Sequence, residues 1–185
     1  YTSKKANPIT DIYCLDAIKR IFKYLPAAAK DGNDRTAREQ MALAAYEAGV
    51  CINNSSVTLV HGMSRPIGAL FHVPHGISNA MLMTECFDYV CDGAEKRFAD
   101  MARAIGKADE ADSDAEGARK FVAACKEICD VCNIPSVSGY GIDLDEFRRA
   151  MPKMAEDAFA SGSPSNTIKE ISVDDILKIY DRLCK

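Results

Sequence analysis

The sequence holds three histidines, and all of them lie within one short stretch: His61, His72 and His75. His61 and His75 each precede a glycine and stand among apolar residues, a setting that is unusual for scattered surface imidazoles. Two imidazoles can share one metal ion when their nitrogens lie within about 4 Å of each other, since each metal–nitrogen bond is about 2 Å. His61 and His75 are therefore candidate ligands of one ion.

The path of the chain between the two histidines decides whether they can meet. If residues 61–75 formed one straight helix, the two Cα atoms would be about 21 Å apart. Proline and glycine interrupt this stretch at Pro66, Gly68, Pro74 and Gly76, which predicts a reversal between 66 and 74 and a new helix that starts near His75. The reversal would let the two rings face each other.

Two imidazoles are not a complete site, because at least three protein ligands are normal for a catalytic metal ion. The nearest carboxylates that follow, Glu85 and Asp88, fall two to four turns along the expected helix. We therefore expect the remaining ligands to lie outside these 185 residues.

The elements that must position the histidines have helical signatures. Asn7 and Pro8 start a predicted helix that ends at Pro26, and Asp34 caps a second one through Ala48 that could continue toward Val60. A further helix is expected from Ser78. The others are predicted at about 95–105, 114–132, 144–159 and after Ser172. No period-two alternation occurs, so the sequence predicts one all-α domain of about seven helices without an inner boundary.

Composition excludes several classes of protein. The net charge is −4, no Lys/Arg-rich run occurs and Trp is absent, so a nucleic-acid partner is not expected. No apolar run approaches the ~18 residues of a membrane span, and no signal region is visible. The eight cysteines lie in apolar, helical stretches, which indicates reduced thiols and a cytoplasmic location. The first residues, from Tyr1, read as the continuation of a longer chain.

Two blocks, 58–69 (TLVHGMSRPIGA) and 74–80 (PHGISNA), resemble the signature of the iron-dependent (group III) alcohol dehydrogenases. The resemblance extends from residues 6–8 to residues 173–176, and so covers essentially the whole chain. That family combines an N-terminal Rossmann-like domain, which binds the nicotinamide, with a C-terminal multi-helix bundle of the dehydroquinate synthase type. The resemblance implies that residues 1–185 are the metal-binding helical domain without its dinucleotide-binding partner.

The resemblance also assigns residues. It makes His61 and His75 metal ligands, completed by an Asp and a His upstream, for Fe(II) or alternatively Zn(II). Arg65 stands where some members carry a third histidine near the nicotinamide, which makes it a cofactor-adjacent residue. Ile52 and Phe159 fall where the family lines its substrate pocket, although burial in the core explains both equally well and is the interpretation we favour. His72 matches no ligand position.

The implied function is oxidation of a primary or secondary alcohol, or reduction of the aldehyde or ketone, by metal-assisted hydride transfer with NAD or NADP. The resemblance further implies a small-molecule alcohol or aldehyde as partner, a possible homodimer, and little activity for the helical part alone. Two alternatives remain open: a zinc enzyme of the glycerol dehydrogenase type, and a helical interaction domain without catalysis.

A chemical alternative comes from Cys125, Cys129 and Cys132, which have the spacing of a radical-SAM cluster motif. Radical-SAM enzymes need repeated βα units, and the sequence shows none. The three cysteines, at positions i, i+4 and i+7, fall on one face of a predicted helix beside Phe121 and Val122. A buried stripe is therefore the favoured interpretation, since free cysteine is among the most buried residue types.

Overall fold

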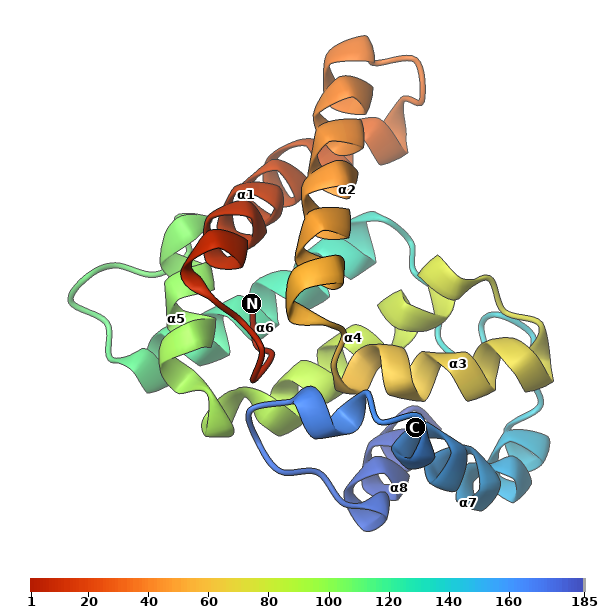
Figure 1. Cartoon of the computed structure of the whole chain (residues 1–185). Coiled ribbons are helices and arrows are strands. Elements are labelled where there is room, and N and C mark those ends of the chain that lie inside the picture. Colours follow the sequence, from red (N-terminus) through yellow and green to blue (C-terminus); the bar gives the residue numbers. More distant parts are fainter. Residues whose placement is uncertain (185) are drawn as a thin grey trace. The chain divides into compact units, whose positions relative to one another are not determined.

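The computed structural model describes residues 1–184, and every regular element in this range is a helix (Figure 1). This confirms the predicted all-α class. The chain divides into two compact units, one made of residues 1–56 and 91–133, the other of residues 57–90 and 134 onward. None of the helices within the described range is long and apolar enough to cross a membrane.

The first unit consists of two helix pairs. The helices α1 (Pro8–Lys30) and α2 (Arg35–Ser55) pack together, as do α5 (Glu95–Ala104) and α6 (Asp114–Val131), with the short η1 (Cys91–Gly93) before α5. Asn7 forms the predicted N-terminal cap of α1, and Asp34 caps α2. The helix α1 continues through Pro26 to Lys30, so the end predicted at Pro26 is wrong.

Aromatic and charged contacts fix the first unit. The ring of Phe121 lies 5.7 Å from that of Phe22 and 6.0 Å from that of Phe98, which joins α6 to α1 and α5. The guanidinium of Arg97 pairs with both carboxylate oxygens of Asp11 at 2.6 Å and lies 3.6 Å from the centre of the Tyr1 ring. These contacts hold the start of the chain against α5.

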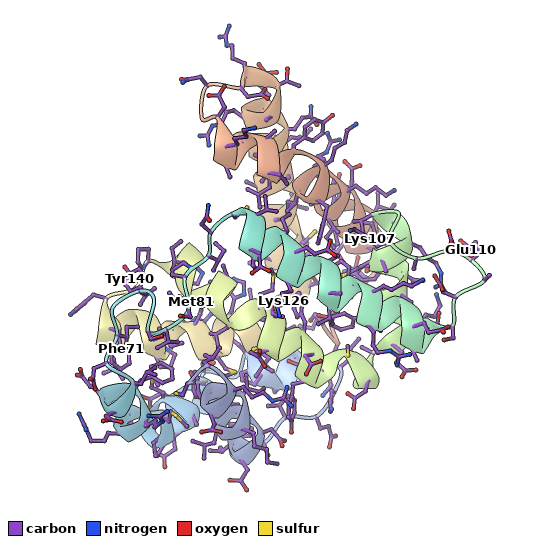
Figure 2. The ribbon with its side chains drawn as sticks, turned by 180° about the vertical axis from the view of Figure 1, so that it is seen from behind. Phe71, Met81, Lys107, Glu110, Lys126 and Tyr140 are labelled. Atoms are coloured by element: carbon purple, nitrogen blue, oxygen red, sulfur yellow. The ribbon has the colours of Figure 1, made fainter. Side chains whose placement is uncertain are left out.

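The second unit carries both candidate ligands. It contains α3 (Leu59–Phe71), α4 (His75–Val90), α7 (Leu144–Ala160), η2 (Pro164–Asn166) and α8 (Val173–Arg182). Figure 2 labels Phe71 at the end of α3 and Met81 in α4. Phe147 lies at the centre of the core, 5.5 Å from the Phe71 ring and 5.9 Å from the Tyr180 ring.

The reversal between the histidines is shorter than the sequence predicted. Helix α3 runs through Pro66 and Gly68 to Phe71, so Pro66 does not break the chain and residues 59–71 form a helix of their own. The buried ring of Pro66 belongs to the apolar face of this helix, and that packing offsets the missing N–H. The turn is confined to residues 72–74, where His72 adopts a left-handed conformation with φ of 54°.

Candidate metal centre

His61 and His75 come together at the junction of α3 and α4. Their ring centroids lie 5.3 Å apart, with an angle of 55° between the ring planes. His61 lies in the first turn of α3 and is half-buried, whereas His75 is the first residue of α4 and is exposed. The tight turn at residues 72–74 reverses the chain and brings the rings together, as predicted in outline.

The separation of the rings matches what a shared ion requires. A metal–nitrogen bond of about 2.0–2.1 Å, with about 1.1 Å from nitrogen to ring centre, places the centroids of two tetrahedral ligands about 5 Å apart. The observed 5.3 Å agrees with this value. The pair therefore fits half of a four-ligand site.

His61 is held in the form that binds metal. Burial lowers the pKa of its imidazole, and the neighbouring His75 and Arg65 lower it further. A neutral imidazole keeps a lone pair for coordination, and the repulsion between positive charges at this site disfavours the protonated form.

Asn79, one turn after His75, lies against the second histidine. Its Nδ2 donates to the backbone oxygen of His75 at 2.8 Å, and lies 3.0 Å from Nε2 and 3.3 Å from Nδ1 of the ring. A group in the ring plane at these distances from both nitrogens would collide with Cε1, which lies between them. The amide nitrogen of Asn79 therefore lies over the face of the ring. The in-plane lone pair of the imidazole therefore stays available. Asn79 Oδ1 is buried and has no hydrogen-bond partner within the described residues.

The segment around η2 holds the helix that carries His61. The Cδ atom of Pro164 would lie 2.9 Å from a Cβ at position 62, so only glycine allows this approach one residue after His61. Thr167 Oγ1 accepts a hydrogen bond from the backbone N–H of Leu59 at 3.1 Å. The buried Tyr180 hydroxyl donates to the backbone oxygen of Met63 at 2.7 Å. The position of the His61 helix is thus fixed from two sides.

Comparisons with known proteins identify the family of the chain. The family described as "Fe-containing alcohol dehydrogenase family, C-terminal" matches residues 1–184. The chain belongs to this family. It is 32% identical over 97% of its length to the NAD-dependent methanol dehydrogenase of Bacillus methanolicus, and 33% identical over 98% to alcohol dehydrogenase 4 of Saccharomyces cerevisiae. The solved structure of an alcohol dehydrogenase from Oenococcus oeni superposes on 99% of the chain, with a TM-score of 0.92 and 30% identity.

The chain spans about half the length of these members of the family. It covers 46% of the methanol dehydrogenase and 47% of the Oenococcus chain. Within residues 1–184, no group of three or more His, Cys, Asp or Glu side chains is arranged to hold a metal ion. The two histidines are the candidate ligands that the described residues bring together.

Arg65, predicted to lie beside the cofactor, is exposed on α3 one turn after His61. Its Nη1 donates to the Oγ of Ser163 at 3.0 Å, which links it to the segment before η2. Sequence reasoning missed Ser163, because it lies almost a hundred positions away along the chain.

Ile52 and Phe159 are not core residues, so the favoured interpretation of both as buried in the core is wrong. The side chain of Ile52 on α2 is 46% exposed, and that of Phe159 on α7 is 45% exposed. Each lies on the outward side of its helix, whose buried face is formed by other residues such as Cys51 and Ala158. Both large apolar groups are therefore exposed on the described part of the chain.

The cysteine alternative finds no support. Cys125 is buried with Phe121 and Val122 on one face of α6, as the stripe interpretation predicted, whereas Cys129 and Cys132 are only half-buried, so the stripe is confirmed in part. Burial raises the pKa of the Cys125 thiol to about 12, which disfavours the thiolate that a cluster needs.

Proposed function

We propose that this chain acts as the C-terminal, metal-binding helical domain of an alcohol dehydrogenase, and that the complete polypeptide interconverts an alcohol with its aldehyde or ketone, using NAD or NADP. The observation that carries the proposal is the His61–His75 pair, whose ring separation fits coordination of one ion. Membership of the Fe-containing family supports the same assignment.

In this proposal each residue of the chain has a task. His61 offers a neutral imidazole because burial lowers its pKa. Asn79 holds the backbone and ring of His75. A divalent ion held by His61 and His75 would supply Lewis acidity for the substrate oxygen, and a bound nicotinamide would supply the hydride acceptor. Fe(II) and Zn(II) both suit a set of histidine and carboxylate ligands, so availability decides between them.

Residues upstream of this chain would provide the other ligands and the nicotinamide site. A cytoplasmic location and a homodimer remain predictions. Gel filtration of the complete polypeptide would test the second.

The test replaces each histidine in the complete polypeptide. We expect His61→Ala and His75→Ala to lose the metal, measured by elemental analysis, and to lose alcohol-dependent NAD(P)H formation. Mutating a residue that only hydrogen-bonds to a metal ligand typically lowers metal affinity by about 10–100-fold. Loss of a ligand itself should lower the affinity by more than this. His72→Asn is the matched control, since His72 is exposed between the two ligands and asparagine tolerates its left-handed backbone. Full turnover by either alanine variant would refute the proposal.

A further inference from the structure

Arg65 is the one formal charge in the part of the chain that carries the histidine pair. Between Glu47 and Glu85 the sequence holds no Asp, Glu or Lys, and Arg65 is its single Arg. Residues 158–168, which include η2, one of the elements that contact α3, hold no charged side chain either, although α7, which also contacts α3, carries charges earlier in its length. A charged side chain within otherwise uncharged surroundings exerts a local field that neighbouring carboxylates do not cancel.

The position of Arg65 places this charge next to the proposed metal site. Residues four apart on a helix lie on the same face, with Cβ atoms about 5–6 Å apart, so Arg65 follows His61 by one turn. The long side chain of arginine can reach groups further along that face, and its Nη1 extends to Ser163.

The guanidinium is oriented but not neutralised. The Oγ of Ser163 accepts a hydrogen bond from Arg65 at 3.0 Å. Ser163 is itself buried and lies in the short connection between α7 and η2. In the described part of the chain no carboxylate forms an ion pair with Arg65, and the side chain is exposed. Four of the five N–H donors of a guanidinium remain after one bond, and they match the planar fork of a carboxylate.

We propose that Arg65 binds a compact anionic group at the far end of the substrate, so that the enzyme prefers alcohols and aldehydes that carry a carboxylate over neutral ones. This inference rests on the proposed function. The acid group is bound and stays intact. The reaction remains removal of a hydride from the alcohol carbon to the nicotinamide and release of the hydroxyl proton.

The experiment compares matched substrates on the complete, metal-loaded polypeptide. The alcohol pairs are 3-hydroxypropanoate with 1-propanol and 4-hydroxybutanoate with 1-butanol, which differ in the acid group. We expect the wild type to show the higher kcat/KM for the acid of at least one pair. We expect Arg65→Ala to lower the ratio of acid to neutral kcat/KM by about tenfold to a hundredfold, the effect of losing a charge-assisted hydrogen bond.

Two further measurements separate binding from other effects. Calorimetric titration should show that the hydroxy acid binds the wild type more tightly than the neutral alcohol, and that Arg65→Ala removes the difference. Arg65→Lys should retain part of the preference, because it keeps the charge but not the fork. Arg149→Ala, at an exposed arginine on α7, is the matched control and should leave the ratio unchanged.

Three outcomes would overturn the inference. The wild type could show no preference for any acid, or Arg65→Ala could lower kcat/KM equally for both members of a pair. The variant could also raise the KM of the nicotinamide cofactor with both substrates, which would assign Arg65 to a cofactor phosphate. Turnover of neutral alcohols that depends on His61 would preserve the proposed function in all three cases, whereas absence of any such turnover would contradict that function itself.

Discussion

At the scale of single residues, the proposed metal site depends on how each imidazole is held. His61 is half-buried in the first turn of α3, which restricts its side chain. His75 is exposed and opens its helix, so it depends on Asn79, which binds its backbone oxygen and lies over its ring. An exposed ligand without such a neighbour would lose more side-chain freedom when it binds an ion.

This difference leads to a prediction for Asn79. In the complete polypeptide, Asn79→Ala should weaken metal binding by about tenfold, because the His75 ring is no longer held in one orientation. Competition with a chelator measures the affinity. Asn54→Ala is the matched control, since Asn54 Nδ2 donates to the Val50 backbone oxygen with the same four-residue spacing, at 2.8 Å, in a helix without ligands. Equal metal affinity in the two variants would remove Asn79 from the site.

The sequence predicted a reversal between His61 and His75, and the chain does reverse there, but at residues 72–74 and not at Pro66 or Gly68. Asn79 was also detectable in principle, since it follows His75 by one helical turn. The hydrogen bond from Arg65 to Ser163 was not detectable. It depends on how distant helices pack, and local patterns carry no information about such contacts.

At the scale of elements, the position of α3 depends on a close approach that only glycine permits. A Cβ at Gly62 would lie 2.9 Å from Pro164 Cδ and 3.0 Å from its Cγ. Gly62→Ala should therefore lower the free energy of unfolding by about 1–2 kcal/mol, because overpacking outweighs the gain in helix propensity. Urea unfolding followed by circular dichroism measures the change.

Gly49→Ala provides the control for this prediction, because Gly49 lies within α2 and a Cβ added there would have no atom within 4 Å. At this position only the higher helix propensity of alanine over glycine acts, and we expect a stabilisation of up to about 1 kcal/mol. If both alanines stabilise the protein, α3 is not held by the contact with Pro164.

The start of α8 links stability to pH. Tyr89 donates to the Asp175 carboxylate at 2.5 Å, and Ser172 and Lys178 also donate to it, so the pKa of Asp175 lies far below its usual range. A lowered carboxyl pKa stabilises the fold above the unfolded value of about 3.9, and this stabilisation disappears as the pH falls through the native pKa. The carboxylate therefore stabilises the start of α8 at neutral pH, and acid removes this stabilisation.

Tyr89→Phe removes the strongest of these bonds and should raise the pKa of Asp175. We expect a loss of about 1–2 kcal/mol at pH 7 that shrinks below about pH 4, where the carboxyl group is protonated in the unfolded chain. Urea unfolding at a series of pH values measures the difference. Tyr140→Phe, at an exposed tyrosine of the same unit (Figure 2), should show no such dependence on pH. A pH-independent loss in Tyr89→Phe would contradict the role of Asp175.

Helix starts were more predictable than helix ends. The caps Asn7, Asp34 and Ser172 lie where the sequence predicted them, because a capping side chain acts on its own backbone. The breaks predicted at Pro26 and Pro66 are wrong. Each proline lies inside a helix. At Pro66 the buried ring packs on the apolar face of α3, which offsets the loss of one backbone hydrogen bond, and the sequence around a proline does not reveal such packing.

At the scale of the whole molecule, the division into two units could not be predicted from the sequence. Each unit is assembled from two separate segments, with changes from one unit to the other after residues 56, 90 and 133. A boundary of this kind leaves no linker and no shift in composition. The all-α class was predictable, because it follows from the helical spacing of apolar residues throughout the chain.

The last prediction concerns what this chain does alone. It offers two of the ligands of the proposed centre, and in the described residues no third side chain joins them. Two imidazoles retain a divalent ion far more weakly than a complete set, and every regular element in residues 1–184 is helical, so the βα unit of a dinucleotide fold is missing from that range. We therefore expect residues 1–185 to fold yet to give no alcohol-dependent NADH or NADPH formation with Fe(II) or Zn(II) added, whereas the complete polypeptide is active. Alcohol oxidation by the chain alone that His61→Ala abolishes would show that these helices contain the whole catalytic site.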